Sequence, residues 1–256
     1  MTDYKKIQIL GVYVDTLTRN QVHQEIDSII HQNEKALILN VNVNCLNLAT
    51  SHPSLRNFLN SARIVFCDGA GVILGARLLN YSIPDRITYA EWIWQLAAIA
   101  EARHYSLFLL GDTQEVVKRT RQELTARFPE LNVVGFHHGF FDKTIGSIEN
   151  EEVINQINKA QPNILLGGFG MPLQERWLME NWGKIDANIA LTGGAVFKYA
   201  SGELRRAPRW MTDHGLEWLG RLIIEPRRLW KRYLVGNPIF FWHILQQRFG
   251  REFTND

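Results

Sequence analysis

Apolar, β-branched runs alternate with stretches of helical periodicity along most of the chain. The helical spacing is clearest near the N-terminus, where Val22, Ile26, Ile29 and Ile30 would share one face. Further helices are expected over residues 45–61 and 89–103. Strands are expected over residues 6–14, 36–43, 63–67, 105–110, 132–136, 163–166 and 188–192. Such alternation predicts an α/β fold with a doubly wound, largely parallel sheet and helices on both faces.

The pattern changes after Gly194. From about Arg205 the sequence has no strand candidate and is helix-like, with breaks at Pro208, Pro226 and Pro238. We therefore expect a Rossmann-like α/β catalytic domain over residues 1–203 and a helical C-terminal appendage over residues 204–256.

Composition fits a globular protein, since 46% of the 256 residues are hydrophobic and 21% are charged. No apolar run reaches the roughly 20 residues that span a bilayer, and the first residues do not resemble a signal peptide. Cys45 and Cys67 each lie in an apolar segment, which favours buried free thiols over a disulfide or a metal site. These features predict a cytoplasmic protein.

Charge is uneven although the net charge is only +2. Residues 204–256 hold ten Lys or Arg against five Asp or Glu, so they carry +5 and the remainder carries −3. The same segment holds four of the eight tryptophans, namely Trp210, Trp218, Trp230 and Trp242. This combination predicts contact with phosphates or an anionic membrane surface. The alternative is a solvated helical pair packed on the sheet.

Asp68 is the first candidate for chemistry, because it stands at the carboxyl end of the apolar run 63–67 and small residues follow it. Ligands of α/β sheets bind at these strand ends, where helix N-termini also converge. The alternative is that Asp68 only caps the next helix.

The segment Asn40-Val41-Asn42-Val43-Asn44 would place three asparagines on one side of an extended strand. Amide side chains both donate and accept, which suits a sugar or uracil. The alternative is a wet edge strand.

Two glycine-containing turns are candidate binding loops. Gly111 and Asp112 end one strand and open a helix, a pattern that is consistent with a phosphate or ribose site and that other βα turns share. Gly168-Phe169-Gly170 lets backbone approach a ligand, and Gln174 and Glu175 then fall in the first turn of a helix. The alternative for the second loop is a simple tight turn.

Several other classes of site lack their signatures. Gly69-Ala70-Gly71-Val72-Ile73-Leu74-Gly75 has one residue too many for the usual dinucleotide fingerprint, and no Walker A loop is present. His137 and His138 are adjacent and have no carboxylate at ligand spacing, so surface loop residues are expected there.

Motifs in a fixed order make residues 9–232 resemble the WecG/TagA/CpsF bacterial glycosyltransferases, glycosyltransferase family 26. Those motifs are NSARIVFCDG (60–69), FLLGD (108–112), GFGMPLQE (168–175), RAPRW (206–210), GLEWLGRL (215–222) and EPRR (225–228). The resemblance implies an inverting transfer of a sugar from a UDP-sugar to a polyprenyl-diphosphate-linked saccharide, at the inner face of the cytoplasmic membrane, in surface or exopolysaccharide synthesis.

The resemblance also implies roles for residues. Asp68 matches the proposed base, Gln174 a glutamine of the active-site pocket, and Arg221 and Arg228 two appendage arginines, with Lys231 in place of a third. Asn40 replaces a threonine near the reacting sugar. We expect Asp68 and Asn40 to be catalytic and the following residues to bind substrate: Asn42, Gly69, Gly111, Asp112, Gly170, Gln174, Glu175, Gly193, Gly194, Arg206, Arg221, Arg228 and Lys231.

No Asp-x-Asp metal motif is present, so we expect no cofactor and metal-independent transfer, with guanidinium groups and helix N-termini opposing the diphosphate charge. The expected partners are a UDP-sugar, a lipid-linked acceptor and an anionic membrane, with no nucleic acid; a homo-oligomer is compatible with the sequence. Two alternatives are an NAD(P)-dependent Rossmann oxidoreductase and a non-catalytic membrane-associated scaffold.

Overall fold

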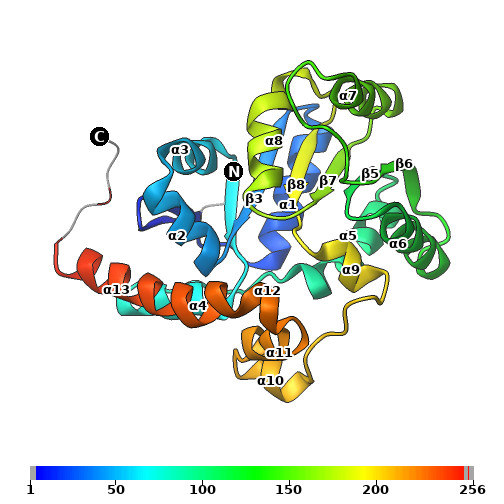
Figure 1. Cartoon of the computed structure of the whole chain (residues 1–256). Helices are drawn as coiled ribbons and strands as arrows, with labels where there is room; N and C mark the ends of the chain where they lie inside the picture. The colour runs from blue at the N-terminus through cyan, green and yellow to red at the C-terminus, as the bar shows by residue number, and fades with distance from the viewer. Residues whose placement is uncertain (1–3, 251–252, 254–256) are drawn as a thin grey trace. The chain divides into compact units, whose positions relative to one another are not determined.

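A computed structural model describes residues 4–250 and residue 253. Within this part, six strands form one sheet (Figure 1), in the order β4 (Ile64–Cys67), β3 (Ala36–Val41), β8 (Ile189–Thr192), β7 (Ile164–Gly168), β5 (Ser106–Gly111) and β6 (Asn132–His137). The ladders joining β3 to β8, β8 to β7, β7 to β5 and β5 to β6 are parallel. Every residue of β3, β5, β7 and β8 is buried, as expected for parallel strands covered on both faces. The predicted α/β fold is confirmed.

The chain divides into two compact units. Unit 1 holds residues 1–19, 40–88 and 205–256, and unit 2 holds residues 20–39 and 89–204. Strand β3 passes from unit 2 to unit 1 between Leu39 and Asn40. The C-terminal segment therefore belongs to the same unit as residues 40–88, and the expected functional division at residue 204 stays a prediction.

Unit 2 contains strands β5 to β8 together with helices that come before and after them in the chain. These helices are α1 (Arg19–His31), α5 (Tyr89–Ala102), α6 (Gln114–Arg127), α7 (Ile148–Ala160), α8 (Leu173–Asn181), the short 3₁₀ turn η1 (Trp182–Lys184) and α9 (Val196–Ala200). Thr113 caps α6 by accepting a hydrogen bond from the N–H of Val116, and Ser147 caps α7 in the same way. These caps fix where the helices begin after their strands.

Unit 1 contains a hairpin, strand β4 and the C-terminal helices. Its elements are β1 (Lys6–Ile9), β2 (Val12–Asp15), α2 (Val43–Ser51), α3 (Pro53–Ser61), α4 (Ala70–Leu78), α10 (Arg209–Asp213), α11 (Glu217–Ile224), α12 (Pro226–Trp230), the π-helical turn η2 (Lys231–Val235) and α13 (Gly236–Arg248). The described residues after residue 204 contain no strand, as expected from the sequence.

Two expected elements are each split in the structure. The strand expected over residues 6–14 is the antiparallel pair β1 and β2, because Leu10 and Gly11 turn the chain with φ of 51° and 81°. The helix expected over residues 45–61 is α2 followed by α3, because Pro53 occupies the first turn of α3 and disfavours helical geometry at His52.

Helix α13 packs on α2 and α4 within unit 1 (Figure 1). Its Gln247 joins the hairpin through both ends of its amide: Oε1 accepts from Leu10 N at 2.8 Å and Nε2 donates to Gln8 O at 2.9 Å. Phe240 is fully buried, and a Cβ added to Gly75 would lie 2.7 Å from its ring. The C-terminal helices are therefore part of the core of unit 1. No described helix combines the length and apolar composition that a membrane crossing requires.

Candidate active site

Asp68 lies immediately after β4 and contacts the neighbouring strand. Its backbone N–H donates to Val41 O at 2.8 Å, which extends the pairing of β4 with β3 by one residue. Asn40, at the end of β3, is buried, and its Nδ2 donates to Oδ2 of Asp68 at 3.2 Å. The two residues expected to be catalytic are therefore in direct contact, while their roles stay predictions.

The capping alternative for Asp68 is wrong. Helix α4 begins at Ala70, its N-cap is Gly69, and no side chain accepts a hydrogen bond from its first turn. Gly69 has φ 154° and ψ 138°, a backbone geometry that a side chain would strain. The Asp68 carboxylate is consequently not the group that caps the start of α4.

The surroundings of Asp68 bring the pKa of its carboxyl group close to neutral pH. Burial raises the pKa of this carboxyl from 3.8 to about 7, and the negative charge of Glu217 adds to the increase. The positive charges of Arg232, Arg221 and Arg86 oppose it. A carboxylate with a pKa close to the working pH can accept a proton and later release it, which is what a general base requires.

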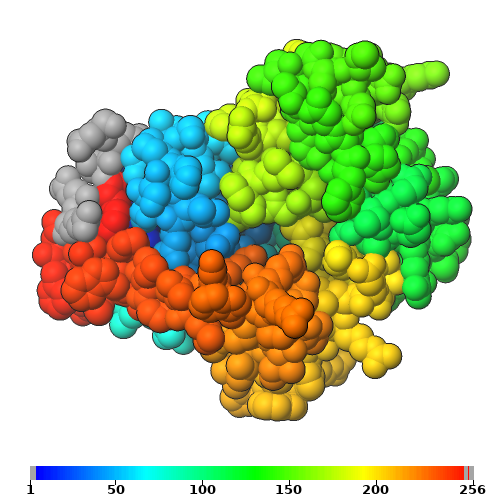
Figure 2. Space-filling model, viewed as in Figure 1, coloured from blue at the N-terminus to red at the C-terminus, as the bar shows by residue number. Residues whose placement is uncertain are grey.

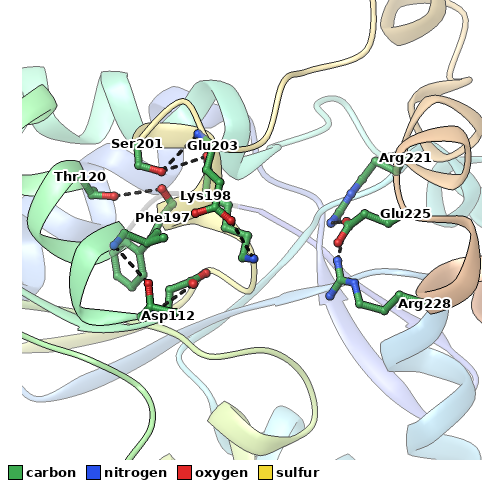
Figure 3. Close-up of polar contacts among 11 residues, drawn as sticks. Asp112, Thr120, Phe197, Lys198, Ser201, Glu203, Arg221, Glu225 and Arg228 are labelled. Atoms are coloured by element: carbon green, nitrogen blue, oxygen red, sulfur yellow. Dashed lines mark hydrogen bonds and ion pairs between the residues drawn. The ribbon is translucent and has the colours of Figure 1, made fainter.

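Glu225 holds two of the arginines named from the sequence. Its Oε2 accepts from Nη2 of Arg221 at 3.1 Å and from Nη2 of Arg228 at 2.6 Å, as Figure 3 shows. These bonds keep the pKa of Glu225 below its usual value although burial opposes them. The Arg221 side chain is mostly buried, whereas that of Arg228 is 58% exposed.

Glu217 makes a second pair of arginine contacts at the start of α11. Its Oε1 lies 3.4 Å from Nε of Arg206, and its Oε2 lies 3.7 Å from Nη2 of Arg86. The Arg86 Nη2 also donates to Thr212 O at 3.2 Å. Arg86 was not named from the sequence, yet the structure places its charge within range of Asp68.

Arg232 is a second site residue that sequence reasoning missed. Desolvation lowers the pKa of its guanidinium, the charges of Arg221 and Arg228 lower it further, and Asp68 raises it. Lys231, which the sequence favoured, is exposed and its Nζ lies 5.6 Å from the centre of the Trp230 ring. A substrate contact by Lys231 stays a prediction, and Arg232 is the cation of this turn that acts on Asp68.

The expected row of three asparagines does not form. Strand β3 ends at Val41, so only Asn40 lies on the strand. Asn42 caps α2, its Oδ1 accepting from Cys45 N at 3.1 Å, and Asn44 lies inside that helix. A short polar side chain that can satisfy a helix N-terminus favours helix initiation there over continued extension. Substrate binding by Asn42 stays a prediction.

In unit 2, the turn after β5 is tightly constrained. A Cβ on Gly111 would lie 2.4 Å from Gly168 O, so this position accepts only glycine. Asp112 has φ 50°, its N–H donates to Gly168 O at 3.2 Å, and its Oδ1 accepts from the next residue, Thr113, at 2.9 Å (Figure 3). The carboxyl group of Asp112 is partly exposed at the carboxyl edge of the sheet, where ligands of α/β folds bind.

Gln174 and Glu175 lie in the first turn of α8 and are each 1% exposed. Gln174 Oε1 accepts from the backbone N–H of Gly170 and of Gly194, both at 3.1 Å. Its Nε2 donates to Glu175 Oε1 at 2.7 Å. Burial raises the pKa of Glu175 to about 7, which the bond from Gln174 opposes.

The glycines around Gln174 differ in the room they leave. A Cβ on Gly170 (φ 91°) or Gly194 (φ 55°) would have no atom within 4 Å, so both face open space. Gly193, by contrast, packs against Val196 and donates its N–H to Gly167 O at 2.6 Å. Gly170 and Gly194 can therefore admit a ligand close to the backbone, and Gly193 shapes the turn.

Of the other residues considered for chemistry, the two cysteines are unreactive and the two adjacent histidines lack partners for a metal among the described residues. Cys45 and Cys67 are buried free thiols, and burial beside Asp68 raises the pKa of Cys67 to about 12. Among residues 4–250 and 253, no three His, Cys, Asp or Glu side chains gather as a metal site would require. His137 is the last residue of β6, so the expected loop position is wrong for it, and its Nδ1 interacts with the O of the next residue, His138, at 2.8 Å.

Comparison with known proteins gives a consistent result over nearly the whole chain. A family model described as the glycosyl transferase WecG/TagA/CpsF family matches residues 7–254. The N-acetylglucosaminyldiphosphoundecaprenol N-acetyl-β-D-mannosaminyltransferase of Staphylococcus aureus strain NCTC 8325 is 29% identical over 245 residues, which cover 95% of this chain and 93% of that protein. The protein of the same name from strain MRSA252 is 28% identical with the same coverage.

Proposed function

Because the chain belongs to the glycosyl transferase WecG/TagA/CpsF family, we propose that it moves a sugar from a UDP-sugar to a saccharide on a polyprenyl diphosphate. Family membership overturns the oxidoreductase alternative and makes this chain a transferase rather than a scaffold. The names of the Staphylococcus aureus relatives state transfer of N-acetyl-β-D-mannosamine to N-acetylglucosaminyldiphosphoundecaprenol. An acceptor of that chemistry, a sugar on an undecaprenyl diphosphate, is the one proposed here.

Asp68 is the proposed general base. The acceptor hydroxyl oxygen attacks the anomeric carbon of the donor, its proton passes to an Asp68 carboxylate oxygen, and the bond from the anomeric carbon to UDP breaks with its electron pair leaving on the diphosphate. Attack opposite the leaving group inverts the anomeric configuration. The observation that carries this proposal is Asp68 at a strand end, with its pKa raised to about 7 and Asn40 bonded to it.

Negative charge that develops on UDP needs opposing charge. Arg221, Arg228 and Arg232 form a cationic group in the unit that holds Asp68, and guanidinium groups bind diphosphate oxygens with two parallel hydrogen bonds. We assign these arginines to the diphosphate of donor or acceptor. The reaction is then expected to proceed without a divalent metal, since charge neutralisation is supplied by the chain.

The donor sugar depends in part on Asn40. Its amide occupies the place of a family threonine and is larger, with two donors and an acceptor in place of one hydroxyl. Asn40→Thr is therefore expected to change the ranking of UDP-sugars more than the stability of the fold. An unchanged ranking would show that Asn40 serves only the packing around Asp68.

The acceptor is a lipid, and unit 1 offers a surface suited to one. The segment from α11 to α13 exposes Ile223, Ile224, Leu234 and Trp242 and also carries arginines. Figure 2 shows this segment in orange and red. Apolar side chains beside cations favour the interface of an anionic membrane. We assign this surface, defined by those four residues, to the inner face of the cytoplasmic membrane.

Transfer from a panel of UDP-sugars to a short-chain polyprenyl-diphosphate N-acetylglucosamine tests the proposal. We expect one UDP-sugar to give a disaccharide lipid with inverted configuration, at the same rate with EDTA as with added Mg²⁺. Loss of activity in EDTA that Mg²⁺ restores would contradict metal independence. Absence of product from every UDP-sugar, while UDP itself binds, would contradict the proposed acceptor.

A further inference from the structure

The side chain of Gln174 is held at both ends. Its amide oxygen accepts two backbone N–H groups, that of Gly170 in the turn between β7 and α8 and that of Gly194 in the turn between β8 and α9. Its amide nitrogen donates to Glu175 at 2.7 Å. Because the carbonyl end faces two donors and the nitrogen end faces a carboxylate, only one orientation of the amide satisfies all three partners.

We propose that Glu175 is a positioning residue, which fixes the amide of Gln174 so that this side chain holds the two glycine turns together. The inference deepens the proposed function, since Gly170 and Gly194 border open space where a substrate would approach. Without an acceptor at residue 175, the Gln174 amide can rotate and present its nitrogen to the two N–H groups, which would break both bonds.

The burial of Glu175 supports this role. A carboxyl group that is 1% exposed costs free energy unless its oxygens are bonded. Oε1 accepts from Gln174, yet Oε2 is buried without a hydrogen-bond partner among the described residues. A carboxylate that served a structural salt bridge would not leave Oε2 without a partner. A carboxylate that serves to accept from one donor, the Gln174 amide, needs only Oε1. The raised pKa of Glu175 agrees with a group that shares this site with a neutral amide and no cation.

The first test measures hydrogen exchange of the Gly170 and Gly194 amides, which requires no substrate. In Glu175→Met, similar in length but unable to accept, exchange at both amides should rise by about tenfold or more, the effect of losing a bond worth roughly 1.4 kcal/mol. Glu175→Gln keeps an acceptor oxygen and should restore protection to within about threefold of the wild-type chain. Arg176→Gln, at the exposed neighbouring position, is the matched control.

The second test separates positioning from stability. At a temperature where each variant is folded by circular dichroism, Glu175→Met should lower kcat by about tenfold or more with a smaller change in KM, because misplaced turns disturb the reacting geometry more than binding. Glu175→Gln should recover most of kcat. If Glu175→Met does not fold, Glu175→Asp, whose carboxylate is one methylene short, replaces it in both measurements.

Outcomes of the two tests are independent. Wild-type exchange at Gly170 and Gly194 in the Met or Asp variant would overturn the positioning role, whatever the activity. Faster exchange in the Met variant, with recovery in Glu175→Gln, would support it even if no UDP-sugar were a donor. Equal loss of exchange protection across all of unit 2 would show that Glu175 is a general stabilising residue, which also overturns the proposal.

Discussion

The Nδ2 of Asn40 donates to Oδ2 of Asp68 at 3.2 Å, joining the ends of two neighbouring strands. A hydrogen bond of this kind favours the ionised carboxylate, while burial and Glu217 favour the protonated form and raise the pKa to about 7. The balance leaves Asp68 able to exchange a proton near neutral pH. The activity of the enzyme should therefore follow the charge of this one carboxyl group.

Asp68→Asn is expected to lower kcat by on the order of 10²–10⁴, the usual effect of losing a general base. In the wild-type chain the rate should rise with pH through about 7, because only the ionised form accepts a proton. Initial rates from pH 5 to 9 check both statements. Asp186→Asn, which changes an exposed acid shortly before β8 in unit 2, is the control. Full activity in Asp68→Asn would exclude Asp68 as the base.

Asn40→Ala should move the rate profile to higher pH. Removal of the donor to Oδ2 withdraws a bond worth about 1–2 kcal/mol from the charged form, which corresponds to an increase of about one unit in the pKa of Asp68. The midpoint of the profile reports the change. Asn44→Ala, in the adjacent helix α2, provides the comparison, and a midpoint that is equal in both variants would argue that the bond is absent in solution.

Arg232→Gln should shift the same profile in the same direction. The positive charge of Arg232 lowers the pKa of Asp68, so its loss leaves the carboxyl protonated at higher pH. Arg227→Gln removes a charge from an exposed position of α12 and should leave the midpoint in place. Identical midpoints for the two variants would show that Arg232 does not face Asp68 in the active enzyme.

The membrane surface is testable without truncating helices that belong to the core. Combined serine substitution of Ile223, Leu234 and Trp242, which are 69%, 56% and 61% exposed, should weaken binding to anionic liposomes by on the order of 100-fold. Ile145→Ser, at an equally exposed apolar position of unit 2, is the control. Salt should weaken wild-type binding, because part of the attraction is between charges. Unaltered binding by the triple variant would place the membrane contact elsewhere.

Glu175 should make the fold less stable as pH rises. The folded chain keeps the Glu175 proton up to a pH of about 7, whereas an unfolded chain loses it near 4.5. The free energy of unfolding of the wild-type chain relative to Glu175→Gln should then fall by about 3 kcal/mol between these pH values. Urea unfolding at pH 5 and pH 8 checks this, and a difference that stays constant with pH would mean that Glu175 ionises normally.

Much of the fold could be predicted because each strand of the parallel sheet is a short apolar run between polar turns. The expected range 36–43 begins where β3 begins and ends two residues later, and the expected range 105–110 is displaced by one residue from β5. Positions where two kinds of local structure compete were harder to predict from the sequence. Asn42 can extend a strand or cap a helix, and Pro53 sits where a helix can either end or begin.

The site was predicted in part, for a similar reason. Asp68 directly follows an apolar strand whatever the rest of the chain does, so its place at the strand end is local information. The place of Arg232 depends on which face of a helix carries it. Helical spacing puts Arg232 on the same face as Arg221, Glu225 and Arg228. Lys231 does not share that face. That spacing was the signal that could have selected Arg232. The bonds from Gln174 to Gly170 and Gly194 join separate turns, and nothing local in the sequence encodes them.

Both native cysteines are sealed from solvent, and the one beside Asp68 has its pKa raised to about 12. A thiol that is both buried and protonated reacts slowly with maleimides and iodoacetamides. The wild-type chain should therefore take up little thiol-reactive label, so neither native cysteine has to be removed before a labelling experiment. A single cysteine introduced at an exposed position of α11 or α13 can carry an environment-sensitive fluorophore, whose emission would report the moment at which that helix leaves water for lipid.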